Sequence, residues 1–178
     1  MAKKPKKPKI IRQVVGEYER KRGGEIMEKV KLIGRIHLVL RDKRGRIKED
    51  RLIDNTITAV GKAELAGLMV VDVGGTGFDY IAIGIGTPSA TALGSESTTN
   101  GGARRGGVDV TGTRITTTTA DDTGQLVTTF TFTGALALTE AGIFNAASAG
   151  TMLASQNFAV YNVADTDTLT ITWKIKIA

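Results

Sequence analysis

The sequence lacks cysteine and has one histidine, one tryptophan and three prolines among its 178 residues. The absence of cysteine excludes disulfide bonds, thiolate nucleophiles and cysteine-ligated metal sites. A single histidine excludes histidine-rich metal centres and catalytic arrangements that need two histidines. There is no run of about 18 apolar residues to span a membrane, and no signal-peptide core follows the basic N-terminus. We therefore expect a chain made in the cytoplasm, with no membrane partner.

Positive charge is concentrated toward the N-terminus. Residues 1–51 hold 18 Lys or Arg and 7 Asp or Glu, a net charge of +11, whereas residues 52–178 hold 6 and 11, a net charge of −5. This division predicts two parts with different roles. The basic part is expected to attract either nucleic acid or an acidic protein surface, unless its first nine residues serve only to solubilise the chain.

Residues 1–28 are predicted to form a basic N-terminal arm. Residues 1–9 are rich in lysine and proline, and we expect them to be extended and to order only against a partner. Residues 10–28 have a weak helical pattern that Gly23-Gly24 interrupts, with too small an apolar face to fold alone. We expect this short helix to pack on its own domain or on a neighbouring subunit. The arm cations predicted to bind a partner are Lys3, Lys4, Lys6, Lys7, Lys9 and Arg12.

Residues 29–53 have the pattern of a β-hairpin. Apolar residues between positions 32 and 40 alternate, and residues 42–45 are turn formers, with Gly45 able to take a positive φ. The hairpin tip is basic, which makes it a candidate contact for an acidic partner, with phosphate as the less favoured alternative. Its predicted partner-binding residues are Arg41, Arg44 and Arg46, with Lys43 and Lys48 beside them. No aromatic side chain lies nearby to stack on bases, so recognition of single-stranded nucleic acid is unsupported.

The rest of the chain predicts one helix followed by many strands. Residues 57–70 have a helical stripe, and Asp54-Asn55-Thr56 offers capping side chains. Strand-like alternation follows at residues 79–86, 108–119, 126–133, 136–144, 151–160 and 169–177, with a long loop at 87–107. The core is predicted to include Ile83, Phe130 and Trp173. We predict a mainly β fold, in which residues 29–178 form an antiparallel β-sandwich or jelly-roll-like domain with one internal helix.

Motifs for cofactors and catalysis are weak. Gly84-Ile85-Gly86 lacks the third glycine and the helix of a dinucleotide-binding loop, so no cofactor is expected. Acidic residues in turns, Asp121-Asp122 with Asp109 or Asp165 with Asp167, suit calcium by type but lack the twelve-residue loop pattern. His37 is predicted to be a surface or half-buried strand residue without an orienting carboxylate. We therefore expect a protein that is not an enzyme, with no resident metal.

Glu140 is the most unusual carboxylate because it interrupts an apolar stretch. It is predicted either to turn outward or to form an ion pair. The candidate partners are the arginines of the β-rich part, Arg104, Arg105 and Arg114. A bidentate pair with Arg104 or Arg105 would fix a loop onto the sheet.

Several segments in residues 55–178 occur in a familiar order. The segments are IAIGIGT at 81–87, TEAGIFN at 139–145, GTMLA at 150–154 and DTLTITW at 167–173. In this respect the chain resembles a widespread group of small structural proteins of tailed bacteriophages and, more loosely, the attachment domain of phage tail-collar fibres. The resemblance covers about the last two thirds of the chain and leaves residues 1–50 outside.

The resemblance implies a non-enzymatic virion subunit. It would assemble with itself, as a trimer, and dock on other virion proteins such as the major capsid protein, as a capsid decoration or head-fibre protein. The contact elements would be the Gly84-Ile85-Gly86 backbone, the 87–107 loop and the basic arm. A tail, collar or baseplate component is the alternative of the same kind, and a nucleic-acid-binding protein that uses residues 1–51 is the alternative of another class.

Overall fold

A computed structural model describes residues 18–20, 26–28, 30–69 and 76–178. Its strands are β1 (Tyr18–Arg20), β2 (Ile26–Glu28), β3 (Leu32–Arg41), β4 (Ile47–Ile57), β5 (Tyr80–Gly84), β6 (Thr111–Ile115), β7 (Thr123–Thr131), β8 (Leu136–Phe144), β9 (Met152–Val163) and β10 (Thr168–Ile177). They are accompanied by one α-helix, α1 (Ala59–Leu68), and one turn of 3-10 helix, η1 (Gly107–Asp109). The predicted mainly β class with one internal helix is confirmed.

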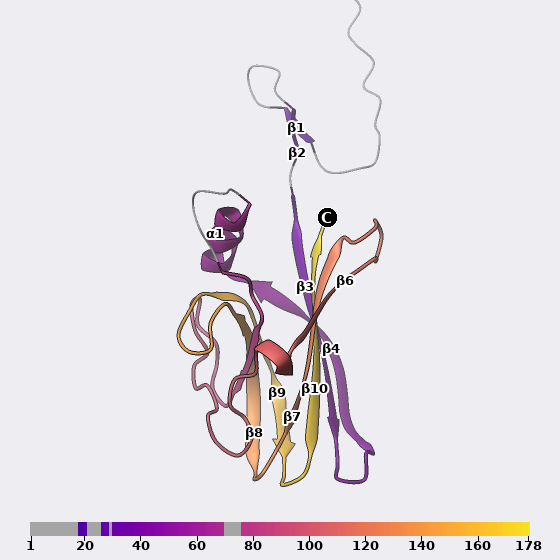
Figure 1. The fold of residues 1–178 in the computed structure, drawn as a ribbon, viewed down its shortest axis with the longest axis vertical. Helices are drawn as coiled ribbons and strands as arrows, with labels where there is room; N and C mark the ends of the chain where they lie inside the picture. Colours follow the sequence, from indigo (N-terminus) through magenta and orange to yellow (C-terminus); the bar gives the residue numbers. More distant parts are fainter. Residues whose placement is uncertain (1–17, 21–25, 29, 70–75) are drawn as a thin grey trace, which may run out of the picture.

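Eight of the strands form one antiparallel sheet in the order β5-β8-β9-β4-β3-β10-β7-β6. The sheet curls into a half-barrel (Figure 1). Strand β4 joins its two halves, because it pairs with β3 as far as Asn55 and then with β9 at Thr56 and Ile57. All eight strands therefore belong to a single hydrogen-bonded sheet, and the predicted two-sheet sandwich or jelly-roll is not confirmed.

The β3–β4 hairpin matches its predicted pattern. Ile36, Leu38 and Leu40 are fully buried on the concave side of the sheet, as period-2 alternation requires. Gly45 has φ +77° and allows the tight turn. Figure 1 shows this turn at one end of the long axis, while α1 and the C-terminus lie at the other. The hairpin thus carries its basic turn away from the rest of the β-domain.

The core lies inside the curl. Ile83, Phe130 and Trp173 are all fully buried, as predicted. The indole N–H of Trp173 donates to the side-chain oxygen of Asn55 at 2.9 Å, so the one polar atom of the indole is satisfied. Asn55 in turn lies over Gly34, where a Cβ would come within 2.2 Å of that oxygen. The tryptophan is therefore positioned by a polar contact as well as by packing.

Helix α1 covers one end of the half-barrel. Its N-cap is Thr58, whose hydroxyl oxygen accepts a hydrogen bond from the Gly61 N–H at 2.9 Å. A Cβ at Gly61 would lie 2.5 Å from the Leu153 Cα, so the helix packs directly on β9. The predicted cap at Asp54-Asn55-Thr56 is wrong. These residues continue β4, because the register with β3 extends through Asp54 and Asn55.

Two further predictions differ from the structure. Strands β1 and β2 pair antiparallel, with Tyr18 opposite Glu28, so the helix predicted over 10–28 is wrong for these six residues. The rest of the predicted arm, residues 1–17 and 21–25, lies outside the described residues. The strand predicted over 108–119 shortens to β6, because the chain turns at residues 117–122 around the Asp122 carboxylate.

Candidate functional site

The turn of the β3–β4 hairpin is held by the side chain of Asp42. One carboxylate oxygen accepts the backbone N–H groups of Arg44 and Arg46 at 2.8 and 3.0 Å, and the other accepts the Arg46 guanidinium at 2.8 Å. The hydrogen bond from the Arg46 side chain is the main reason that the pKa of Asp42 is below its ordinary value of 3.8. The turn is therefore anchored rather than loose, although it projects into solvent.

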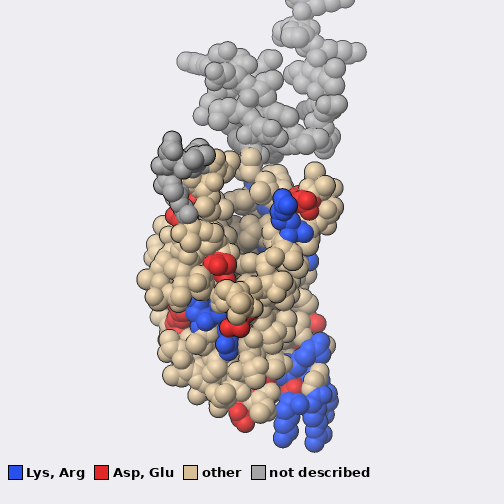
Figure 2. All heavy atoms as spheres, in the orientation of Figure 1, with Lys and Arg blue, Asp and Glu red and all other residues tan. Residues whose placement is uncertain are grey.

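The cations at this turn, which we call the basic tip (residues 41–48), differ in how they are engaged. Arg41 donates to the Gly45 carbonyl at 3.0 Å, and Lys48 pairs with Asp167 at 2.5 Å. Within the part of the chain that the structure describes, no carboxylate lies within ion-pairing distance of Lys43 or Arg44. Figure 2 shows Lys and Arg side chains gathered at this end of the molecule. Lys43 and Arg44 are therefore the cations best placed to meet an acidic partner.

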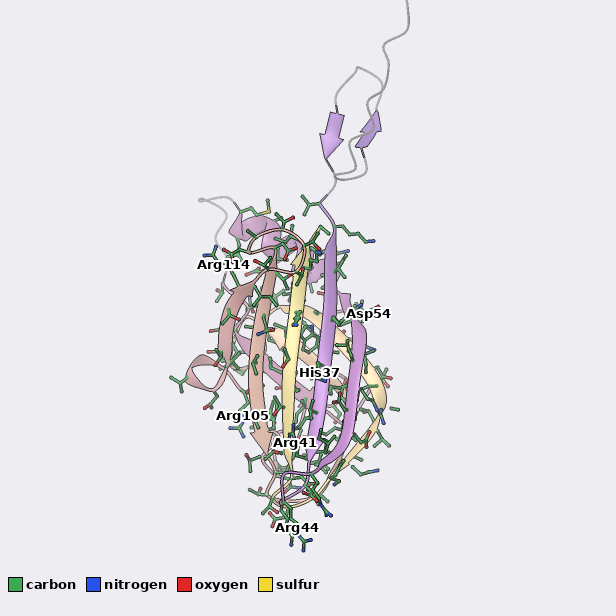
Figure 3. All side chains as sticks on the ribbon, turned by 90° about the vertical axis from the view of Figure 1, so that its right-hand side faces the viewer. His37, Arg41, Arg44, Asp54, Arg105 and Arg114 are labelled. Atoms are coloured by element: carbon green, nitrogen blue, oxygen red, sulfur yellow. The ribbon has the colours of Figure 1, made fainter. Side chains whose placement is uncertain are left out.

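Of the nine predicted partner-binding residues, the structure describes three. Arg41, Arg44 and Arg46 lie together at the basic tip, and Figure 3 shows Arg44 at its extremity. The six arm residues from Lys3 to Arg12 lie outside the described residues. The chain begins β3 at the opposite end of the hairpin, and a ten-residue strand is about 30 Å long. The point where the arm joins the body is thus separated from the tip by the length of the sheet.

Glu140 is fully buried on β8, and among the described residues no arginine pairs with it. Its carboxylate accepts three backbone N–H groups, from Gly86 at 3.0 Å, Gly94 at 2.8 Å and Ser95 at 2.7 Å. The predicted pair with Arg104 or Arg105 is wrong. Backbone donors of residues 86–95 occupy the carboxylate instead, and both of its oxygens accept hydrogen bonds from them.

Arg104 has a different acidic partner. Its guanidinium makes a bidentate pair with Glu96, with distances of 2.8 and 2.6 Å, and it also donates to the Ala146 carbonyl at 2.7 Å. The same group lies 3.8 Å from the centroid of the Phe144 ring. Arg104 and Glu96 both belong to the 87–107 loop, so their pair closes the loop on itself, and the contacts of Arg104 with Ala146 and Phe144 fix the loop to the end of β8. A bidentate pair of the predicted kind is therefore found, but it lies within the loop, with Glu96 in place of Glu140, and the attachment to the sheet comes from the other contacts of Arg104.

Arg105 also has its own contacts. It donates to the Gly101 carbonyl at 3.2 Å and lies 3.9 Å from the Asp109 carboxylate. Its backbone pairs with Ile81 as an isolated bridge. The end of the loop therefore covers the outer edge of β5, which would otherwise present unpaired backbone groups.

The expected contact surface at Gly84-Ile85-Gly86 is occupied by the chain itself. A Cβ at Gly84 would lie 2.4 Å from the Ser95 carbonyl oxygen, and one at Gly86 would lie 2.7 Å from the Ser95 nitrogen. Leu93 packs with Tyr80 against a second small apolar cluster on this outer face. The bare side of the strand admits the 87–107 loop, so this strand and loop form a closed unit rather than an open docking site.

The acidic turns and the histidine have structural partners. Asp122 accepts the backbone N–H of Thr119, and this bond, with other hydrogen bonds to the same carboxylate, lowers the pKa of Asp122 below the ordinary value for aspartate. Asp167 forms an ion pair with Lys48. Among the described residues, no three acidic or histidine side chains are grouped to hold a metal ion. His37 lies on the open face of the sheet (Figure 3), 2.7 Å from an Asp50 oxygen. The histidine was predicted to have no orienting carboxylate, but Asp50 on the neighbouring strand β4 supplies one.

Within the described ranges, no helix has the length and apolar character needed to cross a membrane. Comparison of this chain with protein-family models, with curated proteins and with solved structures finds no match.

Proposed function

We propose that this chain is a non-catalytic structural subunit of a tailed-virus particle, of the capsid decoration or head-fibre type. The observation that carries the proposal is the basic tip, where Lys43 and Arg44 project from a turn anchored by Asp42. A rigid β-hairpin whose cations have no carboxylate partner among the described residues suits an acidic protein lattice, because little conformational entropy is lost when it docks. The order of motifs along residues 81–173 is the second support.

The clamped 87–107 loop also supports a structural role. Glu140 on β8 accepts N–H groups of the loop, Arg104 donates to the Ala146 carbonyl just past the end of β8, and the pair of Arg104 with Glu96 closes the loop on itself. Assembly of the subunit with itself as a trimer, and contact with the major capsid protein, belong to the same proposal. The exposed edge strand β6 offers backbone donors and acceptors to a neighbouring copy. A loop that is fixed in this way keeps one conformation. A virion subunit benefits, because neighbouring subunits then always contact the same surface.

Immunogold electron microscopy of purified particles, with an antibody against this chain, tests the proposal directly. We expect label distributed over the capsid. Label confined to the tail, collar or baseplate would move the protein to that alternative location. Particles without label would overturn the virion role.

Charge reversal tests the basic tip. The double variant Lys43→Glu/Arg44→Glu is compared with Arg114→Glu/Lys174→Glu, which makes the same change of charge elsewhere on the β-domain. We expect at least tenfold weaker binding to particles for the tip variant and little change for the control. Equal loss in both variants would show that only net charge matters and would refute a specific role of the tip.

Salt dependence separates the protein partner from nucleic acid. Binding that rests on six or more lysine–phosphate contacts falls by about 10³-fold or more between 50 and 200 mM salt. We expect a much smaller decrease for particle binding through a shaped lattice contact. On the open sheet face, Arg35 and His37 are already paired with Asp54 and Asp50. Because these basic side chains are paired, the sheet face as described lacks the continuous row of free cations that would bind a phosphate backbone.

A further inference from the structure

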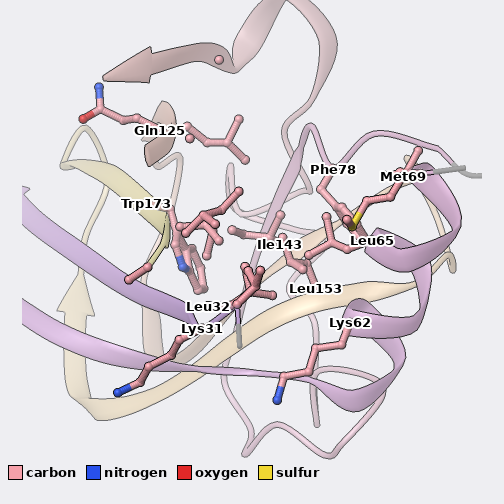
Figure 4. Close-up of a pocket in the computed structure, with 18 of the residues that line it drawn as sticks. Lys31, Leu32, Lys62, Leu65, Met69, Phe78, Gln125, Ile143, Leu153 and Trp173 are labelled. Carbon is pink, nitrogen blue, oxygen red and sulfur yellow. The ribbon is translucent and has the colours of Figure 1, made fainter. Parts of the chain in front are cut away.

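A large apolar cavity lies between α1 and the end of the half-barrel opposite the basic tip (Figure 4). Its volume is about 1350 Å³, and its walls include Leu65, Phe78, Leu126, Leu153 and Trp173. Pockets for small ligands usually measure about 300–1,000 Å³ and carry a few converging polar groups. This cavity is larger, and its walls are mainly apolar, so it suits a stretch of apolar polypeptide better than a small molecule.

The mouth of the cavity is ringed by exposed apolar side chains. Met69 is 82% exposed, Val30 is 68% exposed, Ile177 is 58% exposed and Leu68 is 42% exposed, and all four line the cavity. Contiguous exposed apolar surface of this kind marks a place where another element packs. The described residues end at this mouth on two sides, at Val30 and at Met69.

The pairing of β1 with β2 brings Tyr18 back toward this mouth. Lys31 and Ala178 exchange two backbone hydrogen bonds of 2.6 and 2.8 Å, which hold the start of the body at the rim. Strands β1 and β2 then pair antiparallel, with Tyr18 opposite Glu28. Paired strands lie about 4.8 Å apart. The residues before Tyr18 therefore start beside Glu28, only two positions along the chain from Val30.

We propose that residues 10–15 of the same chain pack into this cavity. The segment reads Ile-Ile-Arg-Gln-Val-Val, so four of its six side chains are branched and apolar. It precedes β1 by only two residues, and a short connection of this kind gives an effective concentration in the millimolar range. A second copy of the chain would have to compete with this intramolecular segment. The lysine-rich residues 1–9 would then extend from the end opposite the basic tip.

Site-specific crosslinking tests the proposal, and the cysteine-free sequence makes it clean. The full chain carrying Val14→Cys and Gln125→Cys is treated with a short bis-maleimide, since Gln125 lines the cavity. The matched control carries Val14→Cys and Lys43→Cys, with the second thiol at the basic tip. We expect an internally crosslinked monomer for the first pair and not for the control. Crosslinked dimers would overturn the proposal in favour of a second copy, and no crosslink would overturn it outright.

A second measurement needs no crosslinker. Replacement of Ile10, Ile11, Val14 and Val15 by serine should raise binding of the dye anilinonaphthalene sulfonate several-fold, because the cavity becomes available. The control replaces Lys3, Lys4, Lys6 and Lys7 by serine and should leave dye binding unchanged. Circular dichroism of both variants confirms that the β-domain is intact. Equal dye binding in the two variants would refute the proposal, whatever the result with virus particles.

Discussion

Replacement of Glu140 is the sharpest test of how the 87–107 loop is held. In Glu140→Gln, one carboxylate oxygen becomes an NH₂ group that cannot accept a hydrogen bond. The oxygen facing Gly86 and Ser95 can be retained, but the N–H of Gly94 then faces another donor. The variant therefore removes the negative charge that two of the bonds share, and it leaves the Gly94 N–H, which faces the buried side chain, without an acceptor.

The cost follows from these contacts. A hydrogen bond to a charged group contributes about 1.5–3 kcal/mol, and an unsatisfied buried donor costs about 1–3 kcal/mol. We expect Glu140→Gln to lower the free energy of unfolding by about 3 kcal/mol, and Glu140→Ala, which orphans all three donors, by more. For a domain of this size, about 3 kcal/mol corresponds to a fall in Tm of about 6–12 °C.

Two assays check this expectation. Thermal unfolding gives the Tm, and amide hydrogen exchange should quicken at Gly86, Gly94 and Ser95 more than in the β3–β10 pair. The control is Asp79→Asn, which makes the same chemical change at an exposed position beside β5. An unchanged Tm with unchanged exchange at the three amides would refute the clamp. A Tm that falls equally in Asp79→Asn would show that the loss of charge alone was responsible.

Three other perturbations have distinct outcomes. Trp173→Ala should cost about 3–5 kcal/mol by urea unfolding, because it removes a fully buried aromatic side chain; an unchanged midpoint would contradict its place in the core. Gly84→Ala should cost about 1–3 kcal/mol, because the new Cβ meets the Ser95 carbonyl at 2.4 Å, whereas Gly77→Ala, with no atom within 4 Å, should cost much less; equal costs would argue against the close approach. The hydrogen bonds to Asp122 lower its pKa, so its contribution to stability is complete above the ordinary Asp pKa of 3.8 and is lost as the pH falls below that value toward the folded-state pKa. Asp122→Asn should therefore flatten the acid limb of a stability–pH curve, and a curve that stays parallel to the wild type would count against this assignment.

Local patterns predicted the strands well. Alternation in residues 32–40 and 169–175 places every second side chain on one face, and the structure buries Leu38, Ile171 and Trp173 accordingly. The turn at Asp42–Gly45 also followed from its residues. These features depend on neighbours within a few positions, so sequence alone reveals them. The helix cap was misplaced because Asp54 and Asn55 have good capping side chains but are held in β4 by the long-range register with β3.

The sequence alone determines the uneven distribution of charge, the order of the motifs and the alternation that predicts the strands. Only the tertiary structure decided which groups meet. Glu140 finds backbone donors 45 to 54 residues away, and no pattern identifies them, because almost every residue carries the same N–H group. Arg104 selects Glu96 and not Glu140 because the folded loop brings that carboxylate to it. The apolar cavity has the same origin: its walls come from α1, β7, β9 and β10, and their meeting depends on how the sheet curls.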